Sequence, residues 1–332
     1  MVSAANRVRI LLTHSNDMRA NYYGPRALAA LQEIGEVRLN DSNKLWSGSD
    51  VVAAAAGCGI IVADRQTEGP AEIFDSLPGL VAFVRVAVDI RNIDVAAASR
   101  NGVLVTQASP GFVPAVVEWI VGAMIDAARH TTDYAAAYRR GALPAARMGR
   151  QLHGSTVGII GYGAIGSRLC EIAAALGMQV LVHDPYRQAP APLRNVDKAS
   201  LLREADFVVP LAVATAETEN LIDAAALALM KGDAWLINAS RGNLVDEGAL
   251  AQALDQRRIA GAAMDVGRAQ DQKPSPDLVR RYNVIATPHI GGLTPQAIEH
   301  QAMETTRQAA AIASGELPVG AVNAAEAHRL HR

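Results

Sequence analysis

The sequence is short of cysteine, of aromatic residues and of long apolar runs, and each shortage excludes a class of protein. Only Cys58 and Cys170 are present among 332 residues, so neither a disulfide scaffold nor a zinc site is expected. Aromatic residues make up 4% and the formal net charge is −2 with mixed signs, which disfavours nucleic-acid binding. No apolar run approaches the roughly 18 residues of a membrane span, and none near the N-terminus suits a signal segment. We therefore expect a cytoplasmic protein without a metal site or a membrane partner.

Short apolar segments that alternate with helical patterns are abundant instead. Strand-like segments include RVRILLTH (7–14) and LVAFVRVAV (80–88), and a second series begins at STVGII (155–160). Such alternation predicts an α/β fold with parallel sheets buried on both faces, and the length suggests about two domains. Residues 113–142 read as one or two long helices, which we interpret as a hinge and a dimer-forming arm.

A glycine array with the context of a dinucleotide site lies at the start of the second series. Gly161, Gly163 and Gly166 follow a predicted strand and open a predicted helix, and Asp184 ends the next strand eighteen residues after Gly166. The glycines permit close approach of a pyrophosphate, which the helix N-terminus stabilises. The Asp184 carboxylate suits ribose hydroxyls and repels a 2′-phosphate, so NAD is expected, although Arg187 keeps NADP open.

Two candidate catalytic residues follow predicted buried strands. Arg241 comes after "LINAS" and His289 comes after "VIATP". Ligands bind at the carboxyl ends of parallel strands. A guanidinium can hold a carboxylate through two hydrogen bonds, and an imidazole can donate or accept a proton near neutral pH. The pair suits hydride transfer at the hydroxyl-bearing carbon of a hydroxy acid. A surface ion pair for Arg241 and a loop histidine for His289 are the alternatives.

The segments "GIIGYGAIG", "HDP", "INASRGNLVDEGAL", "GAAMDV" and "TPHIGG" occur in an order and spacing that resemble the NAD-dependent D-isomer-specific 2-hydroxyacid dehydrogenases. This family includes D-lactate, D-glycerate and 3-phosphoglycerate dehydrogenases. The resemblance implies a Rossmann-type NAD-binding domain over residues 105–290. That domain would be inserted in a flavodoxin-like substrate domain formed by residues 1–104 and 291–332.

The resemblance also implies which residues bind the cofactor. Asp265 matches the aspartate that holds the nicotinamide carboxamide. The family's H-x-P segment is here Leu211-Ala212-Val213, so that a side-chain role of the histidine is lost. The implied cofactor-binding set is Gly161, Gly163, Ala164, Ile165, Gly166, Asp184, Pro185, Leu211, Ala212, Thr215, Ala239, Ser240, Asp265 and Gly291.

The implied catalytic set departs from the family at one position. Arg241 matches the substrate-binding arginine and His289 the acid/base histidine, but the glutamate that normally supports this histidine is replaced by Gln270. Asp271 is the rival partner if the loop bulges by one residue. A glutamine can orient the ring but adds no charge, so His289 is expected to lose its proton at lower pH than beside a glutamate.

The substrate loop departs as well. Ala87, Val88 and Asp89 stand where the family has a G-x-G pair that holds the substrate carboxylate. A carboxylate there is costly unless it is paired, and Arg85 or Arg91 could pair with Asp89. Trp119 replaces a frequent histidine; it could shape the pocket or belong to the core.

The sequence therefore predicts an oxidoreductase that transfers hydride between NAD(H) and a small 2-hydroxy or 2-oxo acid. His289 would be the acid/base and Arg241 the substrate anchor, in a homodimer. An atypical, larger or less acidic substrate is a further possibility. The alternative is an NAD-binding, corepressor-like regulatory protein with weak or no catalysis. The altered loop favours that alternative, whereas the presence of Arg241 and His289 argues against it.

Overall fold

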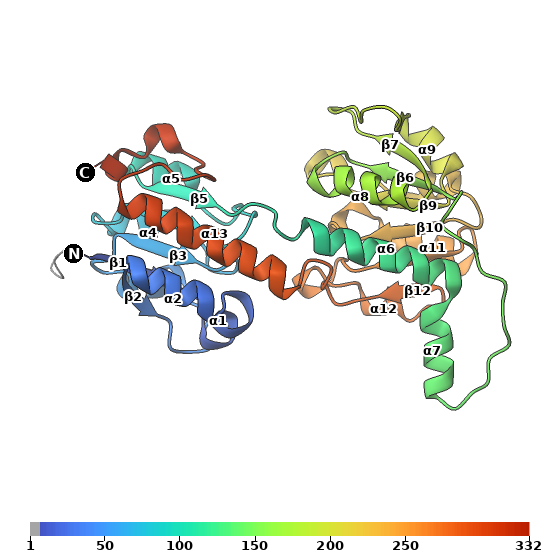
Figure 1. Cartoon of the computed structure of the whole chain (residues 1–332), viewed down its shortest axis with the longest axis horizontal. Coiled ribbons are helices and arrows are strands. Elements are labelled where there is room, and N and C mark those ends of the chain that lie inside the picture. The colour runs from blue at the N-terminus through green and yellow to red at the C-terminus, as the bar shows by residue number, and fades with distance from the viewer. Residues whose placement is uncertain (1–6, 332) are drawn as a thin grey trace. The chain divides into compact units, whose positions relative to one another are not determined.

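The computed structural model describes residues 7–331 (Figure 1). The chain divides into two compact units: Met1–Gly111 with Pro295–Arg332, and Phe112–Thr294. Residues 1–6, which are part of the segment for which no signal sequence is predicted, lie outside the described residues. No helix within the described part of the chain is both long enough and apolar enough to cross a membrane.

The first unit is built on parallel strands in the order β2-β1-β3-β4-β5, the order of flavodoxin-like sheets. The strands are β1 (Val8–Leu12), β2 (Gly35–Leu39), β3 (Ile60–Ala63), β4 (Ala82–Arg85) and β5 (Leu104–Gln107). The helices are α1 (Asn16–Tyr22), α2 (Pro25–Ile34), α3 (Gly48–Ala54), α4 (Ala71–Ser76), α5 (Val95–Arg100) and α13 (Pro295–Ala313).

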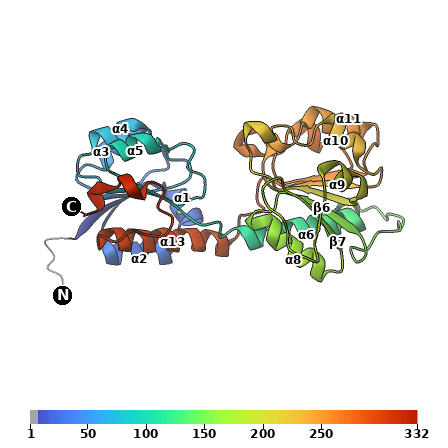
Figure 2. The ribbon, with the colours of Figure 1, turned by 90° about the horizontal axis from the view of Figure 1, so that it is seen from above.

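Both faces of this sheet are buried, because successive side chains of a strand point to opposite faces. In β1, Ile10 and Leu12 belong to one apolar cluster, whereas Leu11 belongs to the other. Figure 2 shows α2 and α13 side by side along the first face, and α3, α4 and α5 along the second. The continuous apolar strands of the sequence are thus explained by helices on both sides.

The second unit is built on parallel strands in the order β12-β11-β10-β9-β6-β7-β8. These are β6 (Thr156–Ile160), β7 (Gln179–His183), β8 (Arg194–Asn195), β9 (Phe207–Pro210), β10 (Trp235–Asn238), β11 (Gly261–Met264) and β12 (Val284–Ala286). The helices are α6 (Val113–Arg129), α7 (Thr131–Arg139), α8 (Ala164–Ala175), α9 (Lys198–Glu204), α10 (Ala224–Leu229), α11 (Glu247–Asp255) and α12 (Pro276–Val279).

The second sheet is covered in the same way, with α6 and α8 on one face and α9, α10 and α11 on the other (Figure 2). In β6, Ile159 packs with the first set of helices and Ile160 with the second. The α/β class with a Rossmann-type unit and parallel sheets, predicted from the alternation, is confirmed. The region 113–142 forms two helices, because His130 adopts a left-handed conformation (φ 57°, ψ 34°) that ends α6.

Candidate active site

The turn between β6 and α8 has the geometry of an anion-binding turn. Gly161 has φ +107°, and a Cβ atom there would lie 2.7 Å from the backbone nitrogen of Ala212. A Cβ atom at Gly166 would lie 2.1 Å from the carbonyl oxygen of Gly161. Gly163 is the N-cap residue of α8 and offers no capping side chain, so the first amides of the helix face outward to a ligand. These residues fit the pyrophosphate of a dinucleotide.

Asp184 ties the loop after β7 to this turn. Its Oδ2 accepts a hydrogen bond from the Tyr162 backbone N–H (2.7 Å), and its Oδ1 accepts from the N–H groups of Tyr186 (2.8 Å) and Arg187 (3.0 Å). Burial raises the pKa of Asp184, but these hydrogen bonds and the nearby Arg187 charge outweigh it, and the net pKa lies below the usual range. The carboxylate is therefore charged at neutral pH beside the glycine turn.

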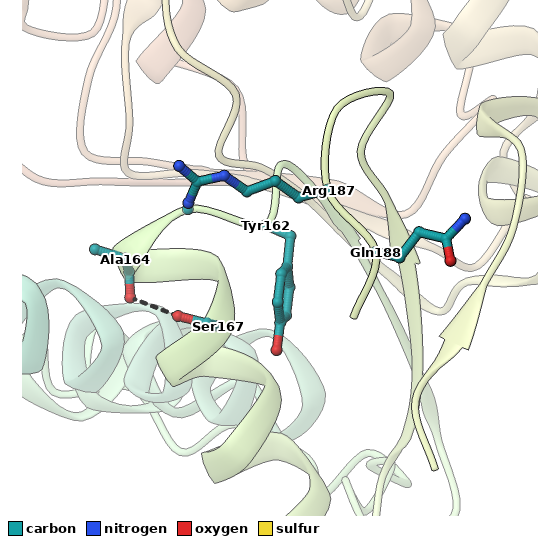
Figure 3. A pocket seen from close by; sticks show the side chains of 6 residues that line it. Tyr162, Ala164, Ser167, Arg187 and Gln188 are labelled. Atoms are coloured by element: carbon teal, nitrogen blue, oxygen red, sulfur yellow. Dashed lines mark hydrogen bonds between the residues drawn. The ribbon is translucent and has the colours of Figure 1, made fainter. Parts of the chain in front are cut away.

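A pocket of ≈ 510 Å³ opens beside the same turn (Figure 3). Figure 3 shows that the guanidinium of Arg187 and the ring of Tyr162 line this pocket. The Ser167 hydroxyl donates a hydrogen bond to the Ala164 carbonyl (3.2 Å). The lining residues are Tyr162, Gly163, Ala164, Ser167, Arg187 and Gln188. Arg187 gives this pocket a positive charge, and the Asp184 carboxylate accepts hydrogen bonds from the backbone of two of the lining residues, Tyr162 and Arg187.

The segment after β9 returns to the glycine turn. The Leu211 N–H donates to the Ile160 carbonyl at 2.7 Å, and Ala212 lies against Gly161. Thr215 begins a single helical turn, where its backbone N–H donates to the Thr218 hydroxyl at 2.8 Å. The backbone of Leu211 and Ala212 is thus held next to the turn, although the family's histidine is missing.

Arg241 is positioned by Asn238, a residue that the sequence interpretation did not single out. Asn238 is fully buried, its Nδ2 donates to the Arg241 carbonyl (2.9 Å), and its Oδ1 accepts from the Ser240 N–H (3.1 Å). The guanidinium of Arg241 donates to the Ser240 carbonyl at 2.8 Å. The signal was a polar residue at the end of the apolar strand "WLIN", where a side chain without a partner would be costly.

A close approach of two glycines joins the turn after β10 to the loop after β11. A Cβ atom at Gly242 would lie 2.0 Å from the carbonyl oxygen of Gly267. At Gly267 a Cβ atom would meet the Pro274 Cα at 2.5 Å. Any side chain at either position would force these segments apart, so the turn that carries Arg241 is packed directly on the loop that carries residues 265–274.

Strand register brings the candidate residues to one edge of the sheet. Asn238 pairs with Met264, and Met264 pairs with Ala286. Arg241 and His289 each come three residues after a member of this row, and Asp265 comes directly after Met264. The three loops therefore leave the sheet at the same level, at the carboxyl ends where ligands bind.

Asp265 holds the loop that carries His289. Its side chain is 1% exposed; Oδ1 accepts from the Thr287 hydroxyl (2.6 Å) and the Ile290 N–H (2.8 Å), and Oδ2 accepts from the Gly291 N–H (2.7 Å). The His289 N–H donates to the Asp265 carbonyl at 2.9 Å. A Cβ atom at Gly291 would lie 2.9 Å from Oδ2 of Asp265, so glycine allows this contact. Asp265 thereby fixes the backbone on both sides of the histidine.

The His289 ring contacts the main chain of the loop after β11. Its Nδ1 lies 3.0 Å from the carbonyl oxygen of Asp271, and because a carbonyl can only accept, a hydrogen bond at this contact requires the proton on Nδ1. The Asp271 carboxylate forms an ion pair with Lys273, at 3.8 Å from Nζ. Gln270 is exposed, and within residues 7–331 no hydrogen bond joins its amide to the ring. Its role as the partner of His289 stays a prediction.

The loop after β4, in the first unit, carries Ala87, Val88 and Asp89. Asp89 forms an ion pair with Arg91, whose NH2 lies 2.5 Å from Oδ2 and whose Nε lies 2.9 Å from Oδ1. Arg91, one of the two candidate partners, thus offsets the negative charge.

Arg85, the other candidate, is completely buried and supports the loop from beneath. It donates to the carbonyls of Asp64 and Thr67 and to the Asn92 side chain.

Trp119 packs against the apolar cluster between α6, α8 and the sheet. Its Cγ would lie 3.7 Å from a Cβ atom at Gly291, so the indole supports the end of the His289 loop. This placement agrees with the core interpretation of Trp119.

Comparison with known proteins gives consistent matches. Residues 121–291 match the family described as D-isomer specific 2-hydroxyacid dehydrogenase, NAD binding domain. A D-3-phosphoglycerate dehydrogenase of Methanocaldococcus jannaschii is 32% identical over 303 residues, 90% of this chain and 57% of that protein. A glyoxylate reductase of Aeropyrum pernix is 34% identical over 313 residues, 90% of this chain and 93% of that protein.

Among solved structures, D-lactate dehydrogenase with NAD+ from Lactobacillus jensenii matches with a TM-score of 0.82 and 25% identity. The match covers 95% of this chain and 99% of that chain. The chain spans about half the length of the D-3-phosphoglycerate dehydrogenases that it matches.

Proposed function

The chain belongs to the D-isomer specific 2-hydroxyacid dehydrogenases, and on this premise we propose that it transfers hydride between NAD(H) and a 2-hydroxy or 2-oxo acid. The observation that carries the proposal is the row Asn238–Met264–Ala286, which brings Arg241, Asp265 and His289 to one sheet edge. The glycine turn after β6 opens at the carboxyl end of the same sheet. Bound NAD(H) would accept or supply the hydride at that edge.

We propose that His289 is the acid/base group. With its proton on Nδ1, the neutral ring presents the lone pair of Nε2, which can take the hydroxyl proton of a hydroxy acid. In the reverse direction Nε2–H of the imidazolium gives its proton to the oxygen of the 2-oxo acid while C2 gains the hydride. In each direction one hydride moves between C2 and the nicotinamide and one proton moves between the substrate oxygen and His289, so atoms and charge balance.

Arg241 is proposed to bind the substrate carboxylate, because a guanidinium fork matches two carboxylate oxygens. Residues 87–89 are proposed to contact the substrate from the loop after β4, with Arg91 offsetting the charge of Asp89. Asp265 is proposed to reach the nicotinamide carboxamide through its remaining lone pairs. Gln270 is proposed to belong to the catalytic loop next to His289, whose ring contacts the neighbouring Asp271 carbonyl.

The cofactor preference is proposed to be NAD rather than NADP. The charged Asp184 carboxylate beside the glycine turn favours ribose hydroxyls and opposes a 2′-phosphate. Arg187 and Gln188 line the adjacent pocket, where they would face the adenosine end of the cofactor. The other residues of the predicted set (Gly161, Gly163, Ala164, Ile165, Gly166, Pro185, Leu211, Ala212, Thr215, Ala239, Ser240 and Gly291) are proposed to line the rest of the cofactor site.

The test is a panel of 2-oxo acids assayed with NADH on the wild type, on His289→Ala and on a control, His153→Ala. The panel includes glyoxylate, hydroxypyruvate and pyruvate, since relatives are named for such reductions. His153 is exposed and precedes β6, at the amino ends of the strands. Loss of the acid/base is expected to lower kcat by roughly 10²–10⁴-fold while NADH binding persists. The control should keep wild-type kcat.

Tight NADH binding without turnover of any acid would refute the enzyme proposal and favour the regulatory alternative. Equal activity of His289→Ala and the wild type would refute the assigned role of the histidine. Turnover that is faster with NADPH would instead overturn the proposed cofactor preference.

We further propose a homodimer that uses residues 113–142, and a cytoplasmic location. Figure 1 shows α7 and the segment after it projecting from the rest of their unit. No residue of α7 is buried, and Leu143 and Met148 nearby are 90% and 97% exposed. Exposed apolar side chains of this kind favour a protein contact. Sedimentation of a single monomeric species would contradict the dimer, and cell fractionation tests the location.

A further inference from the structure

The segment 270–273 forms a turn with an unusual backbone. Asp271 has φ 58° and ψ 25°, and the next residue, Gln272, has φ 56°. Neither residue is glycine, and bulky residues rarely adopt the left-handed region. The Lys273 N–H donates to the Gln270 carbonyl across the turn (3.3 Å), and the Gly267 N–H donates to the Gln272 carbonyl (2.8 Å). Two successive positive φ angles are the mark of a type I′ turn.

This backbone decides what faces the histidine. In the left-handed conformation the Asp271 carbonyl is directed at His289, and the O···Nδ1 distance is 3.0 Å. The Asp271 side chain extends instead towards Lys273. His289 also has a positive φ, +62°, and its backbone is tied to the Asp265 carbonyl. Left-handed backbone is uncommon outside glycine, and its occurrence at both ends of one contact is consistent with a site whose geometry the surroundings impose.

The packing around Gly267 and Arg268 keeps the turn 270–273 in place. Gly267 lies against Lys273 and Pro274, where a Cβ atom would approach the Lys273 carbonyl oxygen to 2.8 Å. The Arg268 N–H donates to the Glu247 carboxylate at 2.8 Å. Both ends of the loop are therefore anchored to the body of the unit, and the contact with His289 does not depend on a flexible side chain.

We propose that the main-chain carbonyl of Asp271 is the group that orients His289 and fixes its tautomer, in place of a side-chain partner at position 270 or 271. The inference rests on the proposed function, because it concerns the acid/base of that reaction. A carbonyl brings a fixed dipole and no titrating charge. The ring is held with Nδ1–H inward and Nε2 available to the substrate, without a contribution from the Asp271 carboxylate.

The first test needs no altered turn. Nitrogen-15 NMR of histidine-labelled protein, assigned by the loss of one signal in His289→Gln, reports which ring nitrogen carries the proton in the neutral form. The Nδ1–H tautomer is expected. The Nε2–H tautomer would overturn the proposal. This readout is independent of turnover, so it separates failure of the inference from failure of the proposed enzyme activity.

The second test changes the side chains and the backbone separately. Asp271→Asn keeps the carbonyl and tolerates the left-handed conformation, and Gln270→Ala removes the amide. Both should keep the Nδ1–H signal. Asp271→Pro fixes φ near −65° and must turn the carbonyl away, so the tautomer preference should be lost and kcat should fall on the order of 100-fold.

The controls are the far-ultraviolet circular dichroism and NADH affinity of each variant, which should match the wild type. A loss of kcat in Asp271→Asn equal to that in Asp271→Pro would identify the carboxylate as the partner. A changed tautomer in Gln270→Ala would identify the amide instead. Either result overturns the proposal, and if Asp271→Pro fails to fold, the wild-type spectrum and these two variants still decide it.

Discussion

Acidification should destabilise the unit that contains β1 by protonating His14. This ring is 1% exposed, its centroid lies 4.9 Å from that of Tyr23, and its Nδ1 has no hydrogen-bond partner in the described part of the chain. Burial lowers the pKa of His14 from 6.5 to about 4; Asp64 opposes this shift, and the charges of Arg19 and Arg85 add to it. The folded unit therefore keeps His14 neutral at pH values where the unfolded chain is protonated.

The sign and size follow from linkage. Because the folded pKa is the lower one, the unfolded state binds the extra proton between pH 6.5 and about 4, and stability falls as the pH decreases through this window. The full cost below pH 4 is about 3 kcal/mol, and about 2 kcal/mol is already lost on going from pH 7 to pH 5. The pKa of Asp64 is lowered in the folded unit, so its carboxylate stays charged between pH 7 and pH 5.

Hydrogen exchange of peptides that cover β1, read by mass spectrometry and corrected for the pH dependence of intrinsic exchange, measures the opening free energy of this unit. We expect it to fall by about 2 kcal/mol between pH 7 and pH 5 in the wild type. In His14→Phe, which keeps the packing against Tyr23 and removes the titration, the fall should be much smaller. The same pH dependence in both proteins would show that His14 is protonated in the folded state, which contradicts the argument.

Two further predictions concern the second unit. Gly161→Ala places a methyl group 2.7 Å from the Ala212 nitrogen, at a residue with φ +107°. The affinity for NADH, measured by fluorescence titration, should therefore fall at least tenfold, or by roughly 1.4 kcal/mol. Unchanged affinity would mean that the turn does not approach the cofactor. Asp265→Asn removes an acceptor from the loop of His289 and turns an amide towards the Gly291 N–H, so urea unfolding should show a loss of about 1–3 kcal/mol and kcat should fall. Asp265→Asn with the urea stability of the wild type would contradict the role of Asp265 in holding this loop. Thr287→Val, which removes only one hydrogen bond to Asp265, is the milder control.

Local signals in the sequence were sufficient for the parts of the fold that depend on periodicity and on glycine. The apolar segments of β3, β4, β9 and β11 are buried at every position, as continuous apolar runs indicate. The glycine array marks the turn at Gly161 because only glycine permits the approach to Ala212. Such features require no knowledge of distant segments.

Elements with weak periodicity were not found in this way. The short helix α1 (Asn16–Tyr22) has no clear apolar periodicity, and it is separated from α2 at Gly24, where φ is 87° and Pro25 follows. The edge strand β2 alternates buried and exposed residues and follows the helix directly at Gly35, without a turn signal. The buried His14 carries no such signal of its own, because its burial depends on segments far away in the chain.

The sequence alone determined the family and the two sheets, and it predicted Arg241, Asp265 and His289 as site residues, because these inferences follow from residue types at fixed spacings. It also showed that a glutamine stands at the position expected for the partner of the histidine. Only the tertiary structure decided which group faces His289. The ring contacts a main-chain carbonyl, which every residue possesses and no residue type announces, and the carbonyl points there because Asp271 and Gln272 are held in a backbone conformation that their side chains disfavour.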